Sequence, residues 1–185
     1  HIKESMDSLI NQTYKEIEIL CFDDGSHDNT LNILKEYRKR DKRIKIFHRD
    51  NNLKKGFNKG ISETLNELIK RSKGKYVARM DADDISDLRR IELQYNQMKK
   101  TKSDVCGSNI ELIDKNSVPL SKVIKFPIKH EEIREGLGFY CCLAHPSVLL
   151  KKESINHEIK NLYQNLQCED YDLWTRLIIK GLIFE

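Results

Sequence analysis

Short apolar runs alternate with amphipathic segments along the first half of the chain. Runs rich in β-forming residues predict strands over residues 16–22, 43–48 and 75–80. Apolar residues at helical spacing predict a helix before the first strand and one after each strand, marked by Ile2, Met6, Leu9 and Ile10, by Leu31, Leu34 and Tyr37, by Phe57, Ile61, Leu65 and Leu68, and by Leu88, Ile91, Tyr95 and Met98. Repeated strand–helix units predict an α/β fold with a mostly parallel sheet and helices on both of its faces.

The second half of the chain is less regular. Residues 104–113 and 118–126 predict two strands around a turn at residues 114–117, and residues 147–150 predict a further short strand. A short helix is expected after Pro127. A last helix is expected to begin near Glu169 and Asp170, with an inward-facing stripe of Leu173, Trp174, Leu177 and Ile178. This half therefore predicts a smaller, mixed or antiparallel portion.

Composition bounds the class of protein. The chain has 185 residues, of which 38% are hydrophobic and 34% charged, which is enough apolar material for one core. We therefore expect a single domain over residues 1–185, with a nucleotide-binding half at 1–100 and an acceptor-binding half at 101–185. The net charge of +4 is small and spread out, which argues against a nucleic-acid partner and leaves peripheral membrane association open.

The cysteines indicate a reducing environment. There are five of them, an odd number, and no C-x-x-C pair occurs, so neither a disulfide framework nor a zinc site fits. No apolar run approaches the ~20 residues that a bilayer-spanning helix needs. A cytoplasmic location is the simplest expectation.

Two of the predicted strands end in acidic clusters. Asp23 and Asp24 follow the first strand, and Asp81, Asp83 and Asp84 follow the third. Ligands of open α/β sheets bind beyond the carboxyl ends of the strands. Both clusters are therefore candidate site residues.

The cluster at Asp81 and Asp83 has two interpretations that stay open. An Asp-x-Asp pair at a strand end can hold a hard divalent cation, which takes its other oxygen ligands from phosphates and water. Alternatively, Asp84, Ser86 and Asp87 precede an amphipathic helix, whose N-terminus favours acidic and capping residues.

The other candidate residues also have a simpler interpretation each. Asp23 and Asp24, followed by Gly-Ser, are typical of a turn, although carboxylates can also accept hydrogen bonds from a nucleobase and a ribose. Glu169 and Asp170 complement a helix dipole, or supply a general base. His145 closes a turn or contacts substrate. The sequence has neither the glycine-rich dinucleotide motif nor a P-loop.

Four segments in order resemble the family 2 nucleotide-sugar glycosyltransferases, which have the GT-A fold. They are residues 8–30 (SLINQTYKEIEILCFDDGSHDNT), 74–84 (GKYVARMDADD), 145–152 (HPSVLLKK) and 169–177 (EDYDLWTRL). The resemblance implies transfer of a sugar from a nucleoside-diphosphate donor, assisted by Mn²⁺ or Mg²⁺ and usually with inversion. A UDP-sugar is the favoured donor, and a glycan or lipid-linked acceptor in cell-surface polysaccharide synthesis is expected.

The resemblance also implies roles for individual residues. Asp23 and Asp24 would contact the base and ribose of the donor. Asp81 would contact the donor and the metal, and Asp83 would ligate the metal directly. We therefore expect these side chains to meet the catalytic base, Asp170, around a single cleft.

On the acceptor side, the resemblance implies that Asp170 is the catalytic base with Glu169 beside it. His145 and Trp174 are weaker acceptor-side candidates, and Trp174 also lies on the apolar stripe of its helix, which favours a core position.

The chain departs from the family pattern at its start and in one loop. It begins at His1 without the first apolar strand that family members have, and residues 51–60 are a shorter, more basic variant of a family loop. We therefore expect a chain truncated at both ends. A nucleotide-sugar-binding domain without catalysis is the alternative, and a sugar nucleotidyltransferase ranks third because a glycine-rich phosphate loop is missing. The oligomeric state is not predicted.

Overall fold

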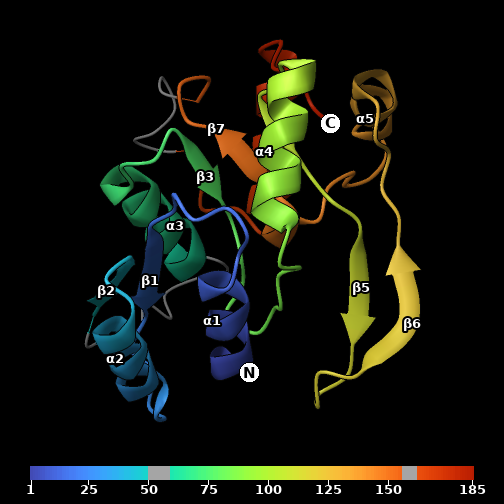
Figure 1. Ribbon diagram of the computed structural model, residues 1–185. Helices are drawn as coiled ribbons and strands as arrows, with labels where there is room; N and C mark the ends of the chain where they lie inside the picture. Colours follow the sequence, from blue (N-terminus) through green and yellow to red (C-terminus); the bar gives the residue numbers. More distant parts are fainter. Residues whose placement is uncertain (50–58, 156–161) are drawn as a thin grey trace.

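The computed structural model describes residues 1–49, 59–155 and 162–185, so most of the basic loop at residues 51–60 lies outside the described residues. In the first half, helices and strands alternate in the order α1 (Ile2–Ile10), β1 (Ile19–Asp23), α2 (Thr30–Arg40), β2 (Ile44–His48), α3 (Lys59–Arg71), β3 (Tyr76–Ala78) and α4 (Arg90–Thr101) (Figure 1). The second half continues with β4 (Val105–Cys106), β5 (Ile110–Ile113), β6 (Pro119–Ile124), α5 (His130–Gly136), a 3₁₀ helix (His145–Ser147), β7 (Leu149–Lys151) and α6 (Glu169–Ile179). Among the helices described, none has the length and apolar character that crossing a bilayer demands.

The strands form one parallel pair and two antiparallel groups. β1 and β2 run parallel, in register from Ile19 opposite Ile44 to Asp23 opposite His48. β7 lies between β3 and β4 and is antiparallel to both. β5 and β6 form a separate antiparallel hairpin at one side of the molecule (Figure 1). The α/β class is confirmed. The expectation of a mostly parallel sheet is wrong for the strands that the structure describes, because β1 and β2 are the one parallel pair among them and β3–β7, β4–β7 and β5–β6 are antiparallel. The two predicted halves share a sheet because β7 pairs with a strand from each.

The strand predicted over residues 104–113 is divided into β4 and β5. The backbone between them bonds to side chains and, through the Gly107 amide, to the Glu185 carbonyl at 2.8 Å. The side-chain amide of Gln94 donates to the Gly107 carbonyl at 3.1 Å, and the Ser108 amide donates to the Ser147 hydroxyl at 3.1 Å. These side-chain bonds satisfy the backbone where the ladder is interrupted.

Helix α4 begins later than its apolar stripe predicts. Leu88, expected on the inner face, is 51% exposed and lies before the first helical residue, Arg90. Its carbonyl accepts a hydrogen bond from the Thr13 amide at 2.8 Å, which holds the preceding loop against the end of α1. Of the other stripe residues, Ile91 and Met98 are buried as predicted, and Tyr95 is partly buried.

Two apolar clusters form most of the core. The larger one joins the β3–β7–β4 sheet to α5, α6 and the last residues of the chain, and its members include Val105, Ile133, Val148, Leu150, Leu162, Leu173, Trp174, Leu177 and Phe184. The smaller one packs α1 and α2 against β1 and β2 through Met6, Ile19, Leu34, Tyr37 and Ile44. The inner stripe predicted for the last helix is therefore confirmed.

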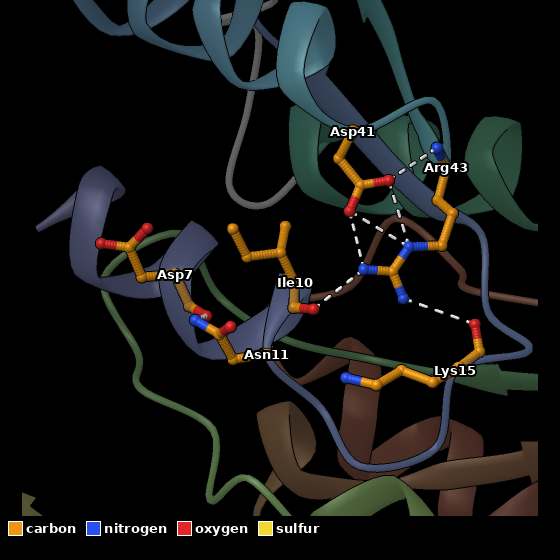
Figure 2. A network of polar contacts seen from close by, with 6 residues as sticks. All are labelled: Asp7, Ile10, Asn11, Lys15, Asp41 and Arg43. Atoms are coloured by element: carbon orange, nitrogen blue, oxygen red, sulfur yellow. Dashed lines mark hydrogen bonds and ion pairs between the residues drawn. The ribbon is translucent and has the colours of Figure 1, made fainter.

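Arg43 connects elements of the smaller cluster through hydrogen bonds. The Arg43 guanidinium donates to both carboxylate oxygens of Asp41 at 2.6–3.1 Å, to the carbonyl of Ile10 at 2.8 Å and to that of Lys15 at 3.4 Å (Figure 2). Ile10 is the last residue of α1, where helix carbonyls lack partners within the helix. Hydrogen bonds from Arg43 lower the pKa of the Asp41 carboxyl. Arg43 thus fastens the end of α1 to the start of β2.

Replacing this arginine should loosen α1. We expect Arg43→Ala to lower the free energy of unfolding by about 1–2 kcal/mol, because several charged hydrogen bonds are lost from a half-buried site. Lys39→Ala is the matched control. Its partner Glu36 and Lys39 itself are more than half exposed, so a change within about 0.5 kcal/mol is expected. Urea denaturation of both variants measures the difference, and equal stabilities would contradict the role given to Arg43.

Candidate active site

The first acidic cluster lies at the carboxyl end of β1. Asp23 is 5% exposed, and its Oδ1 accepts a hydrogen bond from the Ser26 amide at 3.3 Å across the turn. Gly25 has a φ of 78°, a conformation that suits glycine best. Asp24 points its Oδ1 to Arg49 Nε, 3.0 Å away. The turn expected from the sequence is present, and it holds two carboxylates at a strand end.

Arg49, which follows β2, is a residue that the sequence analysis missed. Its guanidinium lies over the ring of Phe22, 4.6 Å from the centroid, and donates to the Thr64 hydroxyl at 3.0 Å. It borders an open pocket of about 520 Å³ lined by Phe22, Ile46, Phe47, His48, Arg49, Glu63, Glu67 and Arg71. The available signal was its position directly after the second predicted strand, at the same sheet edge as Asp23.

The second acidic cluster follows β3. The side chain of Asp81 is 44% exposed and pairs with the guanidinium of Arg79, and Asp83 is exposed. Burial, followed by the charges of Asp81 and Asp83, raises the pKa of the Asp84 carboxyl. The three carboxylates therefore act on one another electrostatically.

Helix capping does not explain Asp81 and Asp83. The helix after the cluster, α4, begins at Arg90, and it is Asp87 whose carboxylate accepts a hydrogen bond from the Arg89 amide at 2.8 Å. A capping carboxylate has to reach amides of the first helical turn. Asp87 therefore stabilises the turn directly before α4, and no carboxylate of the cluster caps the helix.

The donor set of Asp81 and Asp83 fits a hard divalent cation. Mg²⁺ and ions like it are commonly held by one or two carboxylates, together with water and substrate phosphates. In the described parts of the chain, no three side chains of the ligating types gather closely enough to hold an ion unaided. A cation here would therefore need further oxygens from a ligand.

His145 and Tyr163 form a buried pair beside this cluster. The Nε2 of His145 lies 2.9 Å from the Tyr163 hydroxyl. Burial, helped by the charge of Arg79, lowers the pKa of His145 to about 3. The imidazole is therefore neutral at pH 7 and bonded within the protein. Tyr163 was also missed by the sequence analysis, since it lies in an irregular segment.

Glu169 and Asp170 form the first turn of α6. Glu169 is 8% exposed. Asp170 accepts a hydrogen bond from the Tyr171 amide at 2.8 Å, and its other oxygen is 3.9 Å from Cys141 Sγ. The N-terminus of a helix stabilises both negative charges.

Several candidate carboxylates act electrostatically on Tyr163. Burial raises the pKa of its hydroxyl; Arg79 opposes the rise, and Asp170, Glu169 and Asp81 add to it. Charged groups that follow β3 and that begin α6 therefore influence the same buried tyrosine. The predicted convergence of Asp81 with Asp170 is consistent with this arrangement, and Asp83 is next to Asp81 in the chain. Convergence of Asp23, whose contacts are with Ser26 and Arg49, stays a prediction.

Trp174 is a core residue. It has no exposed surface, and its ring meets the rings of His145 and Phe184 edge to face, with centroids 5.9 and 6.3 Å apart. A ring without exposed surface offers no face to an acceptor. The acceptor-side assignment of Trp174 is corrected accordingly: its link to the site runs through His145.

Solved structures share this fold. TarS of S. aureus in complex with UDP superposes with a TM-score of 0.69 at 20% sequence identity, over 95% of this chain and 49% of that one. The mannosyltransferase PcManGT of Pyrobaculum calidifontis, in complex with GDP-Man and Mn²⁺, superposes with a TM-score of 0.70 at 12% identity, over 99% of this chain and 49% of that one. The predicted GT-A fold is confirmed.

Sequence comparisons point to one family. The O-antigen biosynthesis glycosyltransferase WbnJ of Escherichia coli is 34% identical, with 96% of this chain and 66% of WbnJ covered. The β-1,3-glucosyltransferase WfgD of the same species, named for UDP-Glc and α-D-GlcNAc-diphosphoundecaprenol, is 29% identical over 96% of this chain and 64% of its own. The chain thus spans less than two thirds of the length of these curated relatives. The family model described as glycosyl transferase family 2 matches residues 1–157, and the chain belongs to that family.

Proposed function

We propose that this chain carries the donor-binding and catalytic part of an enzyme that transfers a sugar from a nucleoside diphosphate to a hydroxyl group. The observation that carries the proposal is that the charges of Asp81, Glu169 and Asp170 all act on the buried hydroxyl of Tyr163. An acidic strand end and an acidic helix start on one site provide separate groups for the leaving diphosphate and for the acceptor. UDP-sugars are the favoured donors.

The end of β1 would recognise the nucleoside. Carboxylates accept hydrogen bonds from ring N–H and ribose hydroxyl groups, which suits Asp23 and Asp24. Arg49 pairs with Asp24, and its guanidinium lies over the ring of Phe22. The flat ring of a nucleobase would pack against the same planar groups. The solved relatives that bind UDP and GDP-Man support a nucleotide ligand for this fold.

Asp81 and Asp83 would hold Mn²⁺ or Mg²⁺. When bound, such an ion stabilises the negative charge that develops on a leaving diphosphate. The complex of PcManGT with Mn²⁺ supports this role for the fold.

Asp170 would act as the general base. It takes the proton of the acceptor hydroxyl while the acceptor oxygen forms a bond to the anomeric carbon from the face opposite the diphosphate. The bond from that carbon to the diphosphate oxygen breaks, the nucleoside diphosphate leaves, and the configuration is inverted. Glu169 is next to the base in the chain, and the His145–Tyr163 pair is neutral and adds no charge to the site.

The place of action follows from the named relatives. WbnJ belongs to O-antigen biosynthesis, and WfgD is named for a diphosphoundecaprenol acceptor. We therefore propose a glycan or lipid-linked acceptor in cell-surface polysaccharide synthesis, at the cytoplasmic face of the membrane and with peripheral association.

A thermal-shift panel tests the donor site. A ligand at a hundred times its dissociation constant stabilises the folded protein by ~2.7 kcal/mol. We expect UDP with Mn²⁺ to raise the melting temperature, with smaller effects from GDP, CDP and ADP, and Asp81→Asn to lose the part that depends on Mn²⁺. No shift with any nucleotide would contradict the donor site. Measuring products separates the alternatives: free sugar or transfer indicates the enzyme, binding without turnover a binding domain, and pyrophosphate release a nucleotidyltransferase.

A further inference from the structure

Arg79 is a buried cation placed directly between β3 and the Asp-x-Asp pair. Its side chain is 9% exposed, and its guanidinium is the ion-pair partner of the Asp81 carboxylate. Nε of Arg79 has no hydrogen-bond partner in the residues that the structure describes. The guanidinium therefore keeps donor capacity beyond its ion pair with Asp81.

Asp81 is the ion-pair partner of Arg79, and the charge of Asp84 also acts in this neighbourhood. A second arginine, Arg90, donates to the Arg79 carbonyl at 2.8 Å, so another cation lies close to Arg79. His145 is neutral and bonded to Tyr163. A buried guanidinium is costly unless an anion accompanies it. Asp81 is therefore needed both as the counter-ion of Arg79 and as a ligand of any cation that binds in the cleft.

We propose that Arg79 and the divalent cation compete for Asp81, so that Arg79 holds the carboxylate in the empty site and weakens binding of the metal on its own. The inference rests on the metal site of the proposed function. A donor diphosphate brings negative charges that can satisfy the guanidinium once Asp81 has turned to the cation. The consequence is a site that takes up metal together with the diphosphate in preference to metal alone.

The test measures Mn²⁺ binding by the protein without donor, by calorimetry and by the EPR signal of free Mn²⁺. Removing a neighbouring positive charge and a competitor should tighten Mn²⁺ binding by ~10- to 100-fold in Arg79→Gln and in Arg79→Met. Arg79→Lys keeps the charge and should stay within about threefold of the wild type. A purely structural role for Arg79 predicts weaker binding, or no change, in the Gln and Met variants.

Two further variants make the measurement specific. Arg89→Gln removes an equal charge from an exposed side chain in the same loop and should change Mn²⁺ affinity by less than about threefold, since solvent and salt screen it. In an Asp81→Asn background, where no carboxylate remains to compete for, Arg79→Gln should tighten Mn²⁺ binding clearly less than it does in the wild-type background. Failure of Arg79→Gln and Arg79→Met to bind Mn²⁺ more tightly, or an equal gain in Arg89→Gln, overturns the proposal.

A measurement on the wild type covers the case in which the variants do not fold. The Nε–H signal of Arg79 in a nitrogen–proton spectrum should shift as Mg²⁺ is added and should not shift in Asp81→Asn. A signal unmoved by saturating Mg²⁺ also overturns the inference. Donor hydrolysis by the wild type is a separate readout. If the wild type hydrolyses donor but Mn²⁺ affinity does not rise in the Arg79 variants, the competition alone is rejected. If Mn²⁺ affinity rises but no hydrolysis occurs, the proposed transferase alone is rejected.

Discussion

The Asp170→Asn variant is expected to lose most of its turnover while it keeps its affinity for the nucleotide. General-base assistance contributes typically ~10²–10⁴-fold to a rate, and an amide cannot accept the acceptor proton. Asn preserves the shape of the side chain and can still accept the hydrogen bond that the Tyr171 amide donates to Asp170 at 2.8 Å. Steady-state transfer rates, with nucleotide affinity measured in parallel, test this expectation.

Asp172→Asn is the matched control. Asp172 belongs to the same first turn of α6 and has the same charge, but its carboxylate pairs with Arg176 at 2.8 Å. If the helix dipole or the net charge of the turn were the cause, both variants would lose turnover alike. We expect turnover within about threefold of the wild type for Asp172→Asn, since an ion pair of this kind affects stability by ~1 kcal/mol at most and not the chemistry. Near-normal turnover of Asp170→Asn would remove it from the mechanism.

The local pattern of apolar and polar residues predicted the helices and strands that bury one face. The stripe of α6 is an example: Leu173, Trp174 and Leu177 recur at helical spacing and are all buried. The strand-end rule selected Asp23 and Asp81 because each stands at or shortly after the carboxyl end of a strand. Hydrophobic periodicity and turn residues are local properties of the sequence. The elements that they predict form where the tertiary contacts agree with them.

Pairing between distant segments was not predictable in this way. β7 was expected as a strand, but its place between β3 and β4 depends on which edges remain free after the first half has folded. Arg79 was overlooked for a related reason. In the sequence it is one polar residue in an apolar strand, and its pairing with Asp81 became apparent only from the folded structure.

Tyr163 illustrates the same limit more strongly. It lies in an irregular segment, where no periodicity indicates direction, yet its backbone is held from α3. The side-chain amide of Asn66 donates to the Tyr163 carbonyl at 2.8 Å, and the Tyr163 amide donates back to the Asn66 oxygen at 2.9 Å. These reciprocal bonds fix the segment and bring the tyrosine to His145. A side-chain amide far away in the chain thus determines the position of a residue in the site.

The largest expected effect on stability belongs to Trp174→Ala. Truncating a large, fully buried aromatic side chain costs about 3–5 kcal/mol of unfolding free energy, because apolar contacts are lost and a cavity remains. Ile179→Ala is the control on the same helix. Ile179 is 78% exposed, so its truncation should change the free energy by less than about 0.5 kcal/mol. Urea denaturation of both variants gives the two values.

The same variant decides between the two interpretations of Trp174. As a core residue it supports His145 through ring contact, so a smaller aromatic, Trp174→Phe, should recover part of the stability and most of the turnover per folded molecule. As an acceptor contact it would leave stability nearly unchanged on truncation and raise the acceptor concentration needed for half-maximal rate. Two results together would restore the acceptor-side assignment: Trp174→Ala as stable as Ile179→Ala, and a higher acceptor concentration needed for half-maximal rate. The buried ring would then have to become accessible during the reaction.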